Sequence, residues 1–146
     1  MKRLAKVACL LCMCMMLVPT NASAGTKGKQ GSRFDWNPVI DAIIEVESEG
    51  KADAVDKGGK SCGILQITPV LVKDCNRILE LRKSSKRYAM DDRFSVSKSK
   101  EMFLLYQSFY NPKNSVEVAI RSWNGGMNYT KGGTQKYYEK VMSKMK

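Results

Sequence analysis

Helical spacing of apolar residues is the feature that most limits what this chain can fold into. Apolar side chains recur at intervals of three and four residues in five segments, the repeat of one face of a helix. No long stretch alternates apolar and polar residues as a half-buried strand would. We therefore expect a mainly α fold, a helical domain with one short extended or hairpin segment near 56–67. The expected helices cover 38–48, a segment from 69, 96–110, a segment from about 115, and a last one around 138–145.

Local signals predict where several of these helices begin and end. Asn37-Pro38 and Thr68-Pro69 each place a capping residue before a proline at the first helical position. Asn114 or Ser115 caps the fourth helix, and the glycines at 125–126 end it. The polar segment 83–93 is predicted to be a loop.

One acidic residue lies on an apolar helix face. Ile43 and Ile44 precede Glu47 by four and three residues and share its face, whereas Glu45 and Glu49 point elsewhere. Burial raises the pKa of a carboxyl group, and a glutamic acid that keeps its proton can act as a general acid. The alternative is a solvated glutamate at a helix end, or one paired with a lysine.

The first residues of the chain predict export. A basic start is followed by an apolar run at 7–18 and by Ala22-Ser23-Ala24, which together form a secretory signal peptide over 1–24. The run is too short for a membrane anchor, and no other segment could cross a membrane. A lipoprotein start at a cysteine within the run is an alternative. Residues 25–33 are expected to form a flexible basic arm, and 34–146 the domain. The protein would then reach the periplasm or the outside of the cell.

The formal charge of +11 suits a polyanionic partner such as cell wall, a membrane surface or nucleic acid. No nucleic-acid-binding signature is present, and export argues against that class. A basic face kept for solubility is the alternative.

Cys62 and Cys75 are the two cysteines that follow the signal segment. In an oxidising compartment such a pair predicts a disulfide, which could contribute about 3 kcal/mol. Two buried thiols are the alternative.

Three blocks of the sequence resemble the soluble lytic transglycosylases of the lysozyme-like superfamily. The first resembles that family's catalytic signature, with a turn one residue longer than usual, and runs through Glu47-Ser48, Ala54-Val55, Gly63-Ile64-Leu65-Gln66 and Pro69. The second is AIRSWNGG at 119–126, and the third is TQKYYEKV at 134–141. Their order and spacing agree with the family over nearly all of 38–142.

The resemblance implies a reaction with one catalytic carboxylate. Such enzymes cleave the β-1,4 bond between N-acetylmuramic acid and N-acetylglucosamine in peptidoglycan, and leave a 1,6-anhydro sugar. Glu47 would serve as acid and then as base, and no metal or cofactor is needed. The substrate-binding residues would be Ser48, Gln66, Trp123, Asn124 and Tyr137, with Ser48 orienting the site. The alternative for Gln66 is an exposed strand residue, and for Asn124 and Tyr137 it is a capping or packing role.

Two positions depart from the family pattern. Trp123 stands where the family usually has a tyrosine, and its indole can donate but not accept a hydrogen bond. Asp56 lies close to the place of an aspartate in goose-type lysozymes, which hydrolyse the same bond. A second carboxylate could activate water for an inverting hydrolysis. Alternatively, Asp56 is a turn residue.

The chain could also be a non-catalytic peptidoglycan binder, although Glu47 argues against it. The biological role stays open between wall remodelling, help to a secretion or conjugation machine, and attack on a competitor.

Overall fold

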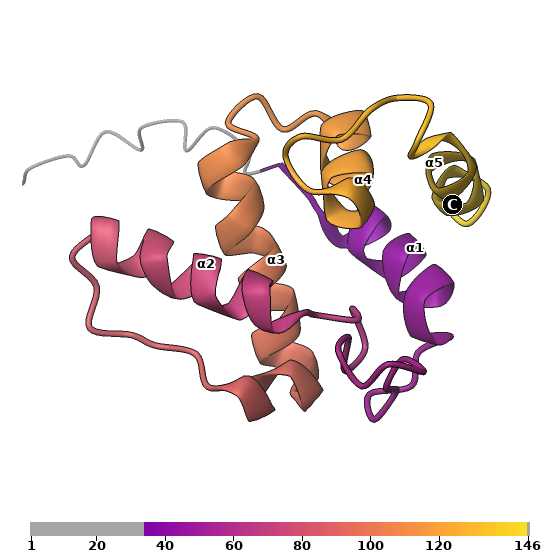
Figure 1. Ribbon diagram of the computed structural model, residues 1–146. Helices are drawn as coiled ribbons and strands as arrows, with labels where there is room; N and C mark the ends of the chain where they lie inside the picture. The colour runs from indigo at the N-terminus through magenta and orange to yellow at the C-terminus, as the bar shows by residue number, and fades with distance from the viewer. Residues whose placement is uncertain (1–33, 146) are drawn as a thin grey trace, which may run out of the picture. The chain divides into compact units, whose positions relative to one another are not determined.

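The computed structural model describes residues 34–145. The predicted signal peptide and basic arm, residues 1–24 and 25–33, lie outside them. The described part contains five α-helices and one 3₁₀ helix (Figure 1): α1 (Asn37–Ser48), α2 (Pro69–Leu81), η1 (Met90–Phe94), α3 (Val96–Tyr110), α4 (Val116–Gly125) and α5 (Gln135–Met142). Strand character is limited to isolated bridges that join Val55 to Cys62 and Cys62 to Ile67. The mainly helical prediction is confirmed, and the extended piece near 56–67 is a chain of turns.

The helices begin close to where the sequence signals place them. The Thr68 hydroxyl accepts from the Leu71 backbone N–H, and the Ser115 hydroxyl accepts from that of Val118. Ser115 and not Asn114 therefore caps α4. Asn37 is the first residue of α1 and not its cap. The Asp35 carboxylate, which the predicted motif did not include, accepts a hydrogen bond of 3.0 Å from the Asn37 backbone N–H at the start of this helix.

Phe103 of α3 lies at the centre of the core. It is fully buried, and its ring packs against Trp36 at 5.7 Å and Trp123 at 5.1 Å between ring centroids. α1 packs against α4 and α5, and α2 packs against α3. Figure 1 shows α1 and α5 on one side of the described unit and α2 on the other, with α3 between them. This arrangement places the end of α1 opposite the start of α2.

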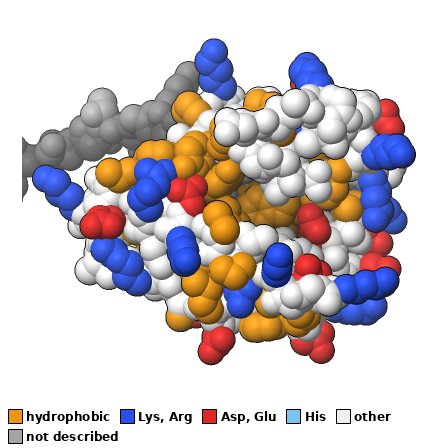
Figure 2. Space-filling view, viewed as in Figure 1, with side chains coloured by type: hydrophobic (Ala, Val, Ile, Leu, Met, Phe, Trp, Pro, Cys, Tyr) orange, Lys and Arg blue, Asp and Glu red, His pale blue; other side chains and the backbone are white. Residues whose placement is uncertain are grey.

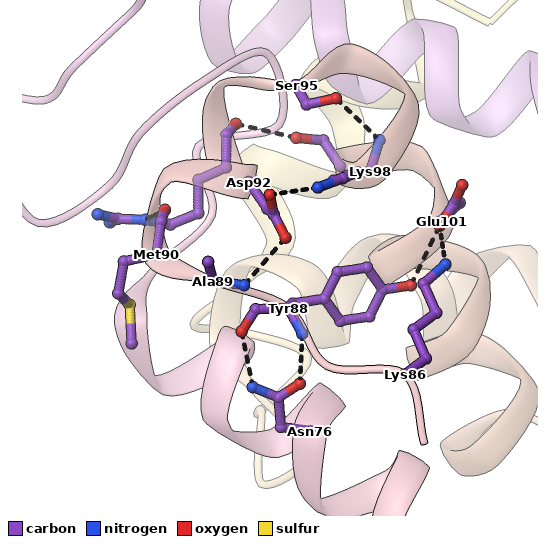
Figure 3. Close-up of polar contacts among 11 residues, drawn as sticks. Asn76, Lys86, Tyr88, Ala89, Met90, Asp92, Ser95, Lys98 and Glu101 are labelled. Atoms are coloured by element: carbon purple, nitrogen blue, oxygen red, sulfur yellow. Dashed lines mark hydrogen bonds and ion pairs between the residues drawn. The ribbon is translucent and has the colours of Figure 1, made fainter. Parts of the chain in front are cut away.

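The polar segment between α2 and α3 is more regular than the predicted loop. The Asn76 side chain makes two hydrogen bonds with the Tyr88 backbone, at 2.9 and 2.8 Å. The Asp92 carboxylate accepts from the Ala89 backbone N–H and pairs with Lys98 at 2.6 Å (Figure 3). The prediction of a loop over 83–93 is therefore wrong for its last part, where charged side chains bond to the backbone and stabilise η1.

The predicted disulfide is absent: Cys62 and Cys75 are both buried free thiols. Cys62 lies in the bridged turn, whereas the Cys75 thiol faces α3 and lies 3.6 Å from the Met102 carbonyl oxygen. Burial raises the pKa of Cys75 to about 12, so it stays a protonated thiol. Instead of pairing, Cys62 fills the core beside the bridged turn and Cys75 fills it beside α2, as small apolar side chains do.

Candidate active site

A cleft of about 740 Å³ opens between the end of α1, the turns before α2, α2 itself, α3 and the end of α4. Figure 2 shows a hollow on this face, with hydrophobic side chains on its floor and charged side chains around it. Among the lining residues are five that the sequence singles out: Glu47, Asp56, Gln66, Trp123 and Asn124. Residues from two of the three sequence blocks therefore meet around one hollow.

Glu47 lies in the last turn of α1, half-buried at the wall of the cleft. Burial raises the pKa of its carboxyl group, and this exceeds the lowering by the Tyr137 hydrogen bond and by the charge of Lys140. Glu45 and Glu49 are exposed and pair with Lys144 and Lys51. One of the three glutamates of this helix end is thus shielded, next to a space that a ligand can enter.

Tyr137 reaches Glu47 from α5. Its hydroxyl donates a hydrogen bond of 2.6 Å to Glu47 Oε1. Burial, followed by the charge of Glu47 and this hydrogen bond, raises the pKa of Tyr137, so the residue stays a hydroxyl donor. Tyr137 does not line the cleft; it donates to one oxygen of Glu47, and the other oxygen has no hydrogen-bond partner within residues 34–145.

Replacing Tyr137 by Phe tests this contact. The hydrogen bond lowers the pKa of Glu47, so its loss raises that pKa. We expect the alkaline limb of the pH–rate profile to move to higher pH, with a drop in kcat of about tenfold, the value of a hydrogen bond to a charged group. Tyr138→Phe is the matched control, since its ring stacks on Arg121 and its hydroxyl has no hydrogen bond within 34–145. An unchanged profile in Tyr137→Phe would contradict the proposed contact.

The start of α5 is tied to α4 by a buried arginine. The Arg121 guanidinium donates to the Lys131 carbonyl, the Thr134 hydroxyl and the Gln135 side-chain oxygen, at 2.9, 3.1 and 2.9 Å. It also pairs with Glu117 at 2.9 Å. A planar donor with this many partners fixes the first turn of α5, and with it the place of Tyr137.

Ser48 is buried behind the site and does not line the cleft. Its hydroxyl donates to the Ile64 carbonyl at 2.8 Å, which joins the end of α1 to the turn that carries Gln66. The side chain thus sets the position of two site residues relative to each other and makes no contact with the cleft space.

Gln66 has a left-handed backbone, with φ of 49°, which is uncommon for a residue with a side chain. Its side-chain nitrogen donates to the carbonyls of Ala54 and Gly63, at 3.2 and 3.0 Å. Its donors are therefore used by the protein, and the oxygen is left to accept from a ligand in the cleft.

Trp123 lines the cleft but does not contact Glu47 through its N–H group, which donates to the Leu65 carbonyl at 3.2 Å. The indole supports the Gln66 turn and packs on Phe103 and Tyr106. Asn124 is exposed at the rim, near the end of α4. The hydroxyl on Glu47 comes from Tyr137 and not from position 123.

Asp56 faces the cleft but also shapes its own turn. One carboxylate oxygen accepts from the backbone N–H groups of Lys60 and Ser61, at 2.6 and 3.0 Å. This is the arrangement of an aspartate that closes a turn.

Four further residues line the cleft that no motif in the sequence marks. Lys73, Asp74 and Arg77 line the cleft from α2, and Tyr106 lines it from α3. The only signal of the three α2 residues in the sequence is their position beside the buried face of α2, which Val72, Cys75 and Leu79 help to form. Position alone does not mark a residue as part of a site, and only the packing of α2 beside the cleft shows that these residues line it.

None of the helices described here is long and apolar enough to span a membrane. Comparisons with curated proteins and with solved structures gave no match. A family model, the transglycosylase SLT domain, matches residues 26–145. Because that match covers well over half of the chain and the fold is mainly helical, this protein belongs to the transglycosylase SLT family, whose domain implies cleavage of peptidoglycan glycan.

Proposed function

We propose that this protein is an exported lytic transglycosylase. It cleaves the β-1,4 bond between N-acetylmuramic acid and N-acetylglucosamine and leaves a 1,6-anhydro-muramic end. The observation that carries the proposal is the Glu47 carboxyl group, half-buried at the cleft wall with a raised pKa. The predicted signal peptide supports action in the periplasm or outside the cell.

In the first step Glu47 is the acid. Its free oxygen gives a proton to the bridging oxygen, and the bond from that oxygen to C1 of the muramic sugar breaks. The positive charge that develops at C1 is taken by the carbonyl oxygen of the sugar's own N-acetyl group, which bonds to C1. The Tyr137 hydroxyl stabilises the carboxylate that Glu47 becomes, since it donates to Oε1.

In the second step Glu47 is the base. The carboxylate takes the proton of the C6 hydroxyl, the C6 oxygen bonds to C1, and the bond from C1 to the acetyl oxygen breaks. Glu47 regains its proton, so the enzyme returns to its starting form and no water is consumed. A group with a raised pKa suits both steps, because it keeps its proton to a higher pH than an ordinary glutamic acid and is a stronger base once it has lost it.

Inverting hydrolysis is the second candidate, because the Asp56 carboxylate lines the same cleft as Glu47. In that reaction Asp56 would activate a water molecule on the far side of the sugar. The two turn hydrogen bonds of Asp56 weigh against it, because they already hold one carboxylate oxygen in the turn.

Mass spectrometry of the released muropeptides tests the proposed reaction. We expect anhydro-muramic ends, which are lighter than hydrolytic ends by one water. Asp56→Asn should keep the anhydro product. Release of only reducing muramic ends by the wild-type protein would overturn the transglycosylase proposal and favour hydrolysis.

A further inference from the structure

We propose that Lys73 and Arg77 form a binding subsite for the carboxylates of peptidoglycan stem peptides. The inference rests on the proposed function and names the part of the substrate, beyond the glycan, that the same cleft recognises. Both residues lie on the face of α2 that lines the cleft. At the usual helical rise, Arg77 lies roughly 12 Å along the helix axis from Pro69, farther than one sugar ring at Glu47 extends.

Arg77 is oriented before any ligand binds. Its Nε donates to the Asp74 carboxylate at 2.9 Å, and one terminal nitrogen donates to the Tyr110 hydroxyl at 2.5 Å. The guanidinium also lies over the Phe109 ring, 5.6 Å from its centroid. The other terminal nitrogen has no hydrogen bond to any residue of 34–145. The donors that remain can bind a carboxylate with little further loss of side-chain freedom.

Lys73 supplies the net positive charge of the proposed subsite. Asp74 largely offsets the charge of Arg77, whereas Lys73 is exposed and has no ion-pair partner among the described residues. The α2 wall of the cleft therefore carries excess positive charge, whereas the acidic Glu47 and Asp56 line the cleft from α1 and from the turns before α2. Tyr106 lines the same cleft from α3, and its ring packs against Trp123.

The chemistry of the substrate identifies the group that these cations meet. The two N-acetylated sugars are uncharged along the strand, so the glycan itself offers no partner to Lys73 or Arg77. The negative charges are carboxylates on the peptides that hang from the lactyl groups of the muramic sugars. A strand bound at Glu47 would bring a neighbouring stem to the wall of α2.

Cleavage of two substrates tests the subsite: peptide-bearing glycan strands with free stem carboxylates, and charge-stripped strands, which are the same strands after those carboxylates have been converted to amides. The wild-type protein should cleave the peptide-bearing strands faster, and added salt should reduce this preference. Lys73→Gln should slow cleavage of peptide-bearing strands by about threefold, in the range of partly exposed charge pairs. Lys73→Glu should slow it by about tenfold, because it replaces the attraction by a repulsion of similar size. Both variants should cleave charge-stripped strands at the wild-type rate. Lys113→Gln, an exposed lysine outside the cleft, is the matched control.

Equal slowing on both substrates, or no slowing on either, would overturn the subsite while leaving the proposed function intact. If the wild-type protein cleaves neither substrate, the proposed function fails, and binding then decides the subsite. For this arm, Glu47→Gln protein is titrated with both kinds of strand. Tighter binding of peptide-bearing strands that is lost in the Glu47→Gln, Lys73→Glu double variant supports the subsite, and equal binding rejects it.

Discussion

Glu47→Gln should lower the release of soluble muropeptides by about 10³-fold or more, because the amide can neither give nor take the proton that both steps need. The amide side chain would keep nearly the same shape and could still accept the Tyr137 hydrogen bond. The loss should therefore appear in kcat, with binding of the strands retained. Comparing release from sacculi by the two proteins measures the effect.

Glu45→Gln is the matched control, since it removes a carboxylate from the exposed face of the same helix, where Glu45 pairs with Lys144 at 3.4 Å. We expect it to release muropeptides at close to the wild-type rate. Equal release by Glu47→Gln and wild type would remove Glu47 from the reaction and with it the proposed mechanism.

Thermal stability gives Glu47→Gln a second, independent readout. Because the folded-state pKa of Glu47 is raised, its contribution to stability is fully present below the unfolded-state pKa and is lost as pH rises through the folded-state pKa. An amide carries no charge at any of these pH values. The Tm of Glu47→Gln should exceed that of wild type by a few degrees at neutral pH and match it below about pH 4. If Glu47→Gln had a lower Tm than wild type at neutral pH, burial of the Glu47 carboxylate would not destabilise the folded protein.

Gly63→Ala should unfold the domain or lower its stability by about 4 kcal/mol or more. A Cβ atom there would lie 1.8 Å from the Arg93 carbonyl oxygen and 2.8 Å from its carbonyl carbon, and the Gly63 backbone has φ of +76°. Both obstacles involve backbone, so no side chain can move aside. For a domain of this size we expect a fall in Tm of roughly 15 °C, measured by circular dichroism.

Gly59→Ala separates the two causes. Gly59 has nearly the same backbone angle, φ of +67°, but nothing lies within 4 Å of an added Cβ. It should lose only the cost of a left-handed backbone, about 1 kcal/mol. Gly132→Ala, in open space without a left-handed angle, should be close to neutral. If Gly63→Ala has the same Tm as Gly59→Ala, the close approach of η1 to the turn is not the reason that position 63 requires glycine.

The sequence could predict the features that depend on local order. Helical periodicity placed α1 and α3, because one face of each must be buried, and the Thr68 cap placed the start of α2. The same periodicity separated Glu47 from Glu45 and Glu49, since a helix assigns its faces by residue number alone. The motifs indicated the family because they keep their order along the chain.

What the tertiary structure decided are the contacts between segments that lie far apart in the sequence. Tyr137 meets Glu47 across 90 positions, and Trp123 supports Leu65 across 58, distances at which no local preference acts. Cys62 and Cys75 are close in the chain, yet packing directs them to different neighbours. Lys73 and Arg77 are ordinary surface cations in the sequence, and only the packing of α2 places them at the wall of the cleft. Local backbone preferences fix each helix by itself, whereas the site depends on how the helices exclude water together.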